Sequence, residues 1–207
     1  MKDCLNIAVL VSGGGTNLQA LIDAQKSGII KNGKISLVVS NNKNAYALER
    51  AKQNDIEAAV VLKKECGSQE AFEAKIINLL EEKDIDLIVL AGFMSILSEN
   101  FTKKFERKIM NVHPSLIPSF CGAGFYGLRV HEAALSYGVK VTGATVHFVN
   151  EIPDGGEIIL QKAVEIMPDD TPEVLQKRVM VEAEWIILPK AVSLFCEGKL
   201  DKNCSEE

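Results

Sequence analysis

The feature of the sequence that most constrains the fold is an alternation of two hydrophobic patterns through the first half of the chain. Short apolar runs rich in β-branched residues occur at residues 7–11, 35–39, 58–62 and 85–90. Segments with apolar residues at helical spacing separate them, at residues 18–25, 45–53 and 70–82. Strands that alternate with helices predict a parallel sheet with right-handed crossovers and with both faces covered.

The second half of the chain predicts strands of a different kind. A short strand is expected at residues 108–112, and strong alternation predicts a long strand at residues 140–149. The sequence PDGG at residues 153–156 is typical of a turn and leads to a strand at residues 157–164, so the pair should form a hairpin. The predicted fold is therefore an α/β, Rossmann-like, mostly parallel twisted sheet with helices on both faces, and with a long strand and hairpin in the C-terminal half.

A closing helix is predicted beyond residue 170. Thr171 is a favourable helix cap, and Pro172 suits the first helical position because that position needs no backbone donor. Pro189 lies within the same apolar segment, and we expect it to kink or interrupt the helix.

Charge and composition argue against several classes of function. The 23 Lys and Arg residues against 28 Asp and Glu residues give a net charge of −5, and no basic cluster occurs, which disfavours nucleic-acid binding. No apolar stretch approaches the roughly 18 residues typical of a membrane span, and the first apolar run leads into glycines rather than a cleavage site. The five cysteines are scattered and never spaced C-x-x-C, unlike disulfide frameworks or zinc sites. We expect a cytoplasmic protein with free thiols.

Residues 11–21, VSGGGTNLQAL, place a glycine-rich loop between a predicted strand and a predicted helix. Glycines let the backbone approach a ligand, and the amides at a helix start attract an anion, so we expect a phosphate site, although a tight turn alone also accounts for the glycines. The dinucleotide fingerprint is incomplete, because Leu18 stands where its third glycine belongs and no acidic residue follows the second strand. A phosphorylated sugar therefore fits better than NAD.

A second candidate is the sequence MNVHPSLIP at residues 110–118, at the end of a predicted strand. Asn111 and His113 are separated by one residue, so in an extended segment their side chains point to the same side. One can polarise a carbonyl group while the other exchanges a proton. Of the other two histidines, we expect His131 to be structural, whereas His147 fits a packing role and a role in the site equally well.

Asp154 is the third candidate, and by itself its turn sequence explains it. Beside Asn111 and His113 it becomes a possible acid partner, because a nearby carboxylate stabilises the imidazolium ion and raises the histidine pKa toward neutrality. A metal site is disfavoured, because no pair of histidines or cysteines has the spacing of metal ligands.

Four segments together resemble one known family. They are SGGGTNLQAL near the start, AGFMSILS at residues 91–98, NVHPSLIPSF at residues 111–120, and VTGATVHFV followed by DGG within residues 141–156. In this order they are similar to the phosphoribosylglycinamide formyltransferase family, folate-dependent enzymes of purine synthesis. The larger relatives that formylate initiator tRNA or hydrolyse formyltetrahydrofolate carry an additional domain. We therefore expect a single formyltransferase domain over residues 1–207, with a phosphate-binding half at 1–100 and a catalytic and folate-binding half at 101–207.

The resemblance implies transfer of the formyl group of 10-formyltetrahydrofolate, as co-substrate, to the amine of 5′-phosphoribosylglycinamide, with no metal. The implied partners are these two small molecules, with neither nucleic acid nor membrane, and the protein should be a monomer or a homodimer. Two alternatives stay open. One is a formyltetrahydrofolate hydrolase, with water in place of the amine, and the other is a non-catalytic module that binds a sugar phosphate through the glycine loop.

The resemblance also implies roles for individual residues. The family's catalytic residues match Asn111, His113 and Asp154. The residues that would bind the phosphate of the substrate are Gly15, Thr16 and Asn17. A ribose-binding glutamate matches Glu184 best, with Glu182 as the next choice.

The residues that would bind the folate are Gln69, Met94, Ser95, Ile96, Leu97 and Asn111, with residues 151–154 against the pterin. Two of them depart from the family pattern, because Gln69 stands where some members have a basic residue and Ser95 replaces an arginine that is common in this segment. Both changes weaken charge-assisted contacts to an anionic folate tail. The stretch SFCGAGFYGLRVHEAAL after Pro118 is longer than in some relatives, which lengthens a loop near the site.

Overall fold

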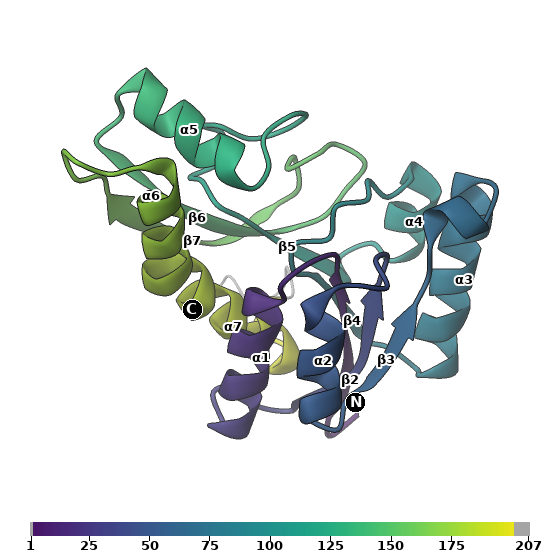
Figure 1. Ribbon diagram of the computed structural model, residues 1–207. Coiled ribbons are helices and arrows are strands. Elements are labelled where there is room, and N and C mark those ends of the chain that lie inside the picture. The colour runs from purple at the N-terminus through teal and green to yellow at the C-terminus, as the bar shows by residue number, and fades with distance from the viewer. Residues whose placement is uncertain (1, 201–207) are drawn as a thin grey trace.

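The computed structural model describes residues 2–200. They form a seven-stranded sheet with helices on both faces, and the strands lie in the order β3-β2-β1-β4-β5-β6-β7 (Figure 1). The strands are β1 (Leu5–Val11), β2 (Gly33–Ser40), β3 (Glu57–Val60), β4 (Leu87–Leu90), β5 (Ile109–His113), β6 (Val141–Phe148) and β7 (Ile158–Glu165). Each of them overlaps a strand predicted from the sequence.

Strands β1 to β5 are parallel, whereas β6 runs antiparallel to β5 and β7 antiparallel to β6. The chain builds the sheet outward from β1 to β3 and then crosses to the other side at β4. Open α/β sheets bind ligands at such a switch point, beyond the carboxyl ends of the strands. The predicted fold class is confirmed, including the hairpin of the second half.

The helices connect these strands in chain order. They are α1 (Thr16–Lys26), α2 (Tyr46–Gln53), α3 (Gln69–Glu82), α4 (Glu99–Lys104), α5 (Leu128–Tyr137), α6 (Pro172–Val179) and α7 (Trp185–Cys196), with a 3-10 turn at Lys63–Glu65. The short helix α4 was not predicted. It begins at the cap Ser98, whose hydroxyl accepts a hydrogen bond from the Phe101 amide at 3.2 Å.

Two hydrophobic cores lie on the two faces of the sheet. Side chains of α1, α2, α6 and α7 form one core, and side chains of α3 and α4 form the other. Strand β1 supplies both, since Ile7 and Val9 point to the first core and Ala8 and Leu10 to the second, all fully buried. A strand that is buried on both sides has no polar face, which explains its uninterrupted apolar sequence.

Strand β3 differs from its sequence prediction. The apolar run at residues 58–62 suggested a buried strand, but β3 has one neighbouring strand and lies at the edge of the sheet. Within it only Ala59 is partly buried, while Val60 is 44% exposed. A short strand at an exposed edge limits unwanted pairing with other chains.

The closing helix is interrupted, but not where the sequence suggested. Pro189 lies inside the continuous helix α7 and is buried, so the expected break at this proline is wrong. The interruption is instead a π-helical turn at Met180–Glu184. There the Trp185 amide donates a hydrogen bond to the Met180 carbonyl, five residues earlier. The turn therefore contains one residue more than an α-helical turn.

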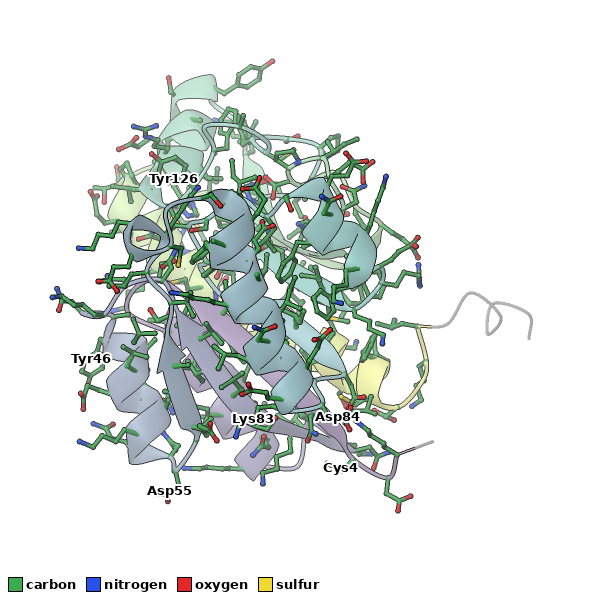
Figure 2. The ribbon with its side chains drawn as sticks, turned by 90° about the vertical axis from the view of Figure 1, so that its right-hand side faces the viewer. Cys4, Tyr46, Asp55, Lys83, Asp84 and Tyr126 are labelled. Atoms are coloured by element: carbon green, nitrogen blue, oxygen red, sulfur yellow. The ribbon has the colours of Figure 1, made fainter. Side chains whose placement is uncertain are left out.

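The two ends of the sheet have different surroundings. Cys4, Asp55 and Asp84, which precede parallel strands, lie at one end of the molecule, and Tyr126 lies toward the other (Figure 2). Tyr126 belongs to the segment between β5 and α5, so this segment lies toward the carboxyl ends of the parallel strands. Among residues 2–200, no helix has both the length and the apolar character that a membrane crossing requires.

Candidate active site

The candidate residues gather where three adjacent parallel strands end. The glycine loop follows β1, residues 91–98 follow β4, and Asn111 and His113 lie near the end of β5. Because β1, β4 and β5 are neighbours in the sheet, these three segments come together at the carboxyl ends of the strands. The Met94 amide donates to the Ser12 hydroxyl at 2.8 Å, which connects the first two of them.

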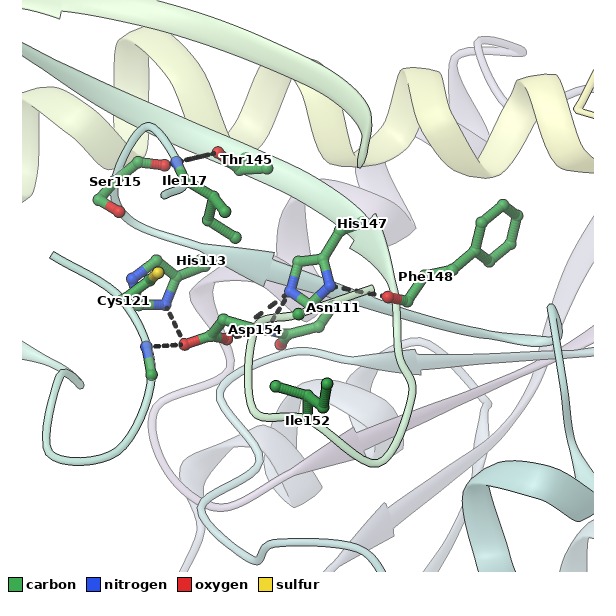
Figure 3. A network of polar contacts seen from close by, with 12 residues as sticks. Asn111, His113, Ser115, Ile117, Cys121, Thr145, His147, Phe148, Ile152 and Asp154 are labelled. Atoms are coloured by element: carbon green, nitrogen blue, oxygen red, sulfur yellow. Dashed lines mark hydrogen bonds and ion pairs between the residues drawn. The ribbon is translucent and has the colours of Figure 1, made fainter. Parts of the chain in front are cut away.

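Asn111, His113 and Asp154 form one cluster, as the sequence predicted (Figure 3). Asn111 Nδ2 lies 3.5 Å from Asp154 Oδ1, and His113 Nδ1 lies 3.5 Å from Asp154 Oδ2. The two β5 residues point to the same side of their strand, and Asp154 reaches them from the loop between β6 and β7. An amide, an imidazole and a carboxylate within this range can polarise a carbonyl group and move a proton.

His147 is a further member of the cluster, which the sequence alone did not assign. It is the register partner of Asn111 across β5 and β6, and it is buried. Its Nδ1–H donates to the Phe148 carbonyl at 2.8 Å, so its Nε2 accepts a hydrogen bond from Asn111 Nδ2 at 3.2 Å. His147 therefore orients the Asn111 amide. The antiparallel register of these two strands is the signal that could have found it.

The charges in the cluster are set by burial and by their neighbours. Burial lowers the pKa of His113, and this outweighs the attraction of Asp154 and the hydrogen bond to the Phe120 carbonyl, which raise it. Asp154 therefore acts on this pKa in the expected direction, but burial makes the net shift downward. Burial raises the pKa of Asp154, but the contact with His147, the charge of His113 and the Gly122 amide together hold it below its usual value.

The backbone at Asp154 has an uncommon conformation. Its φ is +56°, in the left-handed region that aspartate tolerates better than most residues. Its Oδ2 accepts a hydrogen bond from the Gly122 amide at 2.8 Å. The turn and this contact fix the carboxylate between His113 and Asn111.

A cleft of about 520 Å³ opens beside the cluster, and a cavity of about 140 Å³ lies next to it. Met94, Ser95 and Ile96 line the cleft, and Leu97 lines the cavity. Residues 151–154 lie against the same cavity. The structure therefore brings the predicted folate-binding segment next to the catalytic cluster.

The two residues that depart from the family pattern serve internal contacts. Ser95 Oγ accepts a hydrogen bond from Asn41 Nδ2 at 2.8 Å. Gln69 lines neither the cleft nor the cavity, and its amide nitrogen donates to Glu73 Oε1 at 2.6 Å and to the Ile96 carbonyl at 3.1 Å. In this structure Gln69 supports the cleft wall from behind, and direct contact with folate stays a prediction.

The glycine loop has room for a ligand and one position that only glycine fits. Gly15, immediately before α1, has a φ of +69°, and a Cβ there would lie 2.6 Å from the Cβ of Ala47. Apart from its chain neighbours, a Cβ at Gly13 or Gly14 would meet no atom of the described residues within 4 Å. Among residues 2–200, no side chain caps the start of α1, and its first turn holds no acidic residue, so its amides can bind an anion.

Asn17 and Glu184 connect the glycine loop to the closing helix. Asn17 Nδ2 donates to Glu184 Oε2 at 2.6 Å. Burial raises the pKa of Glu184, although the hydrogen bond from Asn17 opposes this. Thr16 Oγ1 lies 3.8 Å from the sulfur of Met180 in the π-helical turn. Glu184 thus lies beside the loop, whereas Glu182 is exposed to solvent.

His131 on α5 is completely buried, and neither ring nitrogen has a hydrogen-bond partner among residues 2–200. Burial, with a smaller contribution from His113, lowers its pKa to about 4. It is therefore a neutral packing residue at pH 7. Within the same residues, no group of three histidine, cysteine or acidic side chains could hold a metal ion.

Comparisons with known proteins show which proteins this chain is similar to. Residues 5–192 match the model of the formyl transferase family. The chain is 46% identical over 194 residues to the phosphoribosylglycinamide formyltransferase of Haemophilus influenzae, which covers 94% of this chain and 88% of that protein. It is also 46% identical to the trifunctional purine biosynthetic protein adenosine-3 of Gallus gallus, over 94% of this chain and 19% of that protein. The crystal structure of glycinamide ribonucleotide transformylase 1 from Symbiobacterium toebii matches with a TM-score of 0.89 and 40% identity, over 96% of this chain and 90% of that one.

Proposed function

The chain belongs to the formyl transferase family, and on this basis we infer that it transfers a formyl group from formyltetrahydrofolate to the amine of 5′-phosphoribosylglycinamide in purine biosynthesis. One observation carries this inference. The cluster of Asn111, His113 and Asp154 lies at the carboxyl ends of the parallel strands, where α1 also begins with a start that suits an anion. A catalyst for this reaction needs both features close together.

The glycine loop suits the phosphorylated substrate. We assign the phosphate to Gly15, Thr16 and Asn17, where free backbone amides and the helix dipole favour an anion. Glu184 lies next to Asn17 and suits the ribose hydroxyls, because a carboxylate accepts hydrogen bonds from them. The amine at the other end of this substrate then points toward Asn111.

The cleft suits the folate co-substrate, which supplies the formyl group. Its rim carries large apolar side chains that are exposed to solvent, with Met94 57% exposed and Ile96 75% exposed. A flat heteroaromatic ring would bury them, and Leu97 and Ile152 in the adjoining cavity extend the same apolar surface. We therefore propose that 10-formyltetrahydrofolate binds between residues 93–97 and residues 151–154.

The cluster can stabilise the charge that the reaction creates. When an amine attacks a formyl carbon, negative charge grows on the formyl oxygen. We propose that Asn111 Nδ2 donates a hydrogen bond to that oxygen from a fixed position, and that the positive charge of the protonated His113 ring stabilises it electrostatically. Asp154, ionised because its pKa is low, then stabilises the imidazolium ion.

Proton transfer completes this proposal. The attacking amine loses a proton, and the folate nitrogen that leaves gains one. Asp154 can accept the first proton directly or through water, and His113 can pass a proton on because it faces the same carboxylate. Holding both substrates at one sheet edge removes much of the entropic cost of their encounter.

An assay that follows the loss of 10-formyltetrahydrofolate, with and without 5′-phosphoribosylglycinamide, tests this function. Turnover that depends strictly on 5′-phosphoribosylglycinamide supports formyl transfer. Formate release in its absence would instead identify a hydrolase, and no turnover under either condition would identify a binding module.

Two further properties belong to the same proposal. The thiols of Cys4, Cys66, Cys121 and Cys196 are free, which favours a reducing compartment such as the cytoplasm. We expect a monomer or a homodimer, and sedimentation of the purified protein distinguishes them.

A further inference from the structure

The segment at residues 119–127 lies between β5 and α5, and the proposed reaction has not used it. Its residues 122–127 line the cleft together with residues 92–96. Its Gly122 amide is the hydrogen-bond donor to Asp154 Oδ2. The segment therefore touches one catalytic residue directly.

Phe120 connects this segment to a second catalytic residue. Its carbonyl oxygen accepts a hydrogen bond from His113 Nε2 at 2.9 Å. The carbonyl reaches this position because Phe120 has a φ of +49°. A bulky residue rarely adopts this left-handed conformation, and it persists only where other contacts hold it.

The side chain of Phe120 supplies such contacts. Its ring packs edge-on against Phe125, with ring centroids 6.4 Å apart, and against Tyr137, with centroids 5.9 Å apart. Tyr137 is the last residue of α5 and is 81% exposed. The ring therefore anchors the strained backbone to a helix, and aromatic pairs of this kind add stability beyond their buried area.

These contacts determine where His113 carries its protons. A carbonyl oxygen only accepts hydrogen bonds, so the short contact with Phe120 keeps a proton on Nε2. The other nitrogen, Nδ1, faces Asp154 Oδ2 at 3.5 Å. In the neutral ring, Nδ1 therefore carries no proton. When Nδ1 takes up a proton, the ring becomes a cation that donates hydrogen bonds to the Phe120 carbonyl oxygen and to Asp154 Oδ2.

We propose that Phe120 is a positioning residue for His113, and that its ring, held by Phe125 and Tyr137, fixes the tautomer and orientation of the imidazole through the Phe120 carbonyl. The effect on rate rests on the proposed formyl transfer. The effect on the tautomer does not, so the two are measured separately.

The tautomer is measured by NMR of the imidazole nitrogens, which is practicable because the chain has three histidines. In the wild-type protein above the pKa of His113, we expect its proton on Nε2. In Phe120→Ala we expect a mixture of both tautomers. His147, held by the Phe148 carbonyl, should keep its proton on Nδ1 in both proteins.

The rate is measured with matched variants. We expect Phe120→Ala to lower kcat by about 10- to 100-fold with a smaller change in KM, because the catalytic ring loses its orientation while the substrate contacts remain. Phe120→Tyr, which keeps a ring, should restore most of the activity. Tyr137→Ala should lower kcat less than Phe120→Ala does, and Tyr137→Phe should not lower it. Ile29→Ala, at another exposed apolar residue, serves as the control.

The proposal is overturned if wild-type His113 carries its neutral proton on Nδ1. It is also overturned if Phe120→Ala is folded and keeps both the wild-type tautomer and the wild-type kcat. If Phe120→Ala does not fold, the comparison of Tyr137→Ala with Tyr137→Phe decides by the same two measurements. If the wild-type protein has the expected tautomer but does not transfer a formyl group, the proposed function is contradicted. The positioning role of Phe120 is then unaffected.

Discussion

The glycine loop and the catalytic cluster both lie at the carboxyl ends of the parallel strands, but they are built in different ways. The loop is one continuous segment, residues 12–17, and it offers mainly backbone groups. The cluster combines side chains of β5, of β6 and of the loop that follows β6. The first depends on one backbone conformation, and the second depends on strand register and on contacts between segments far apart in the chain.

This difference teaches where each part is vulnerable. Backbone amides survive most side-chain substitutions, so the loop should tolerate change except where a Cβ cannot fit. Each side chain of the cluster contacts and orients another, so the loss of one side chain should disturb the positions of the others. Substitutions in the two regions test this contrast.

The largest effect is expected from Asp154→Asn. Asparagine keeps the left-handed turn and the shape of the side chain but loses the charge that stabilises the His113 cation. We expect kcat to fall by about 10²- to 10⁴-fold with unchanged circular dichroism. Near-wild-type turnover would remove Asp154 from the mechanism.

Asn111→Ala tests the proposed oxyanion contact in the same cluster. Loss of one preorganised donor should lower kcat by about 10²- to 10³-fold. Steady-state kinetics at saturating concentrations of both substrates measure this. His147→Ala removes the group that orients Asn111 and also its contact with Asp154, so an equal loss in this variant would show that the arrangement of the cluster, and not donation by Asn111 alone, limits the rate.

Gly15→Ala is expected to disturb the other region. The new Cβ would collide with Ala47 in a conformation that alanine resists, so unfolding free energy should fall by about 1–3 kcal/mol and KM for 5′-phosphoribosylglycinamide should rise. Chemical denaturation and kinetics measure the two effects. Gly14→Ala, with no neighbour within 4 Å, is the control for stability. Equal stability losses in both variants would contradict the assignment of Gly15 as the constrained position.

The buried packing residue His131 on α5 should also make stability depend on pH. The unfolded chain takes up a proton at His131 near its ordinary pKa of 6.5, whereas the folded protein resists until about pH 4. Stability contributed by neutral His131 is therefore present above pH 6.5 and is lost as pH falls to 4, on the order of 3 kcal/mol. Denaturation curves at several pH values should show this loss, and His131→Leu should reduce it. An unchanged pH dependence in the variant would place the effect elsewhere.

The smallest effect concerns the folate tail. Among residues 2–200, no lysine or arginine lines the cleft or its adjoining cavity. We expect additional glutamates on the folate to change KM by less than about threefold, since exposed ion pairs contribute little. Ser95→Arg should increase the preference for longer tails. A strong preference in the wild-type protein would show that a cation outside this lining recognises the tail.

The sequence predicts best what depends on neighbouring residues. The glycine loop, the cap Thr171 and the common direction of Asn111 and His113 follow from spacing within one element, and the structure has all three. The residues alone offered the contact of Asp154 with His113 only as a possibility, because 41 positions separate them in the sequence numbering, and the resemblance implied it.

Features that depend on distant contacts were missed or, for His147, left open. The register partner of Asn111, the inward hydrogen bonds of Gln69 and the carbonyl of Phe120 all involve segments that meet only in the folded chain. The exposure of β3 depends on its place at the sheet edge, which its own apolar residues do not reveal.

The π-helical turn has a consequence for the length of the chain. It holds one residue more than an α-helical turn, so Leu175 and Val179 before it and Ile187 and Leu188 after it can all face the core. Removal of one exposed residue, such as Val181, would leave a regular helix that still covers the sheet. Glu184 would then change its position relative to Asn17. Deletion of a single residue at this turn, without any substitution, should therefore leave the protein folded but reduce its activity.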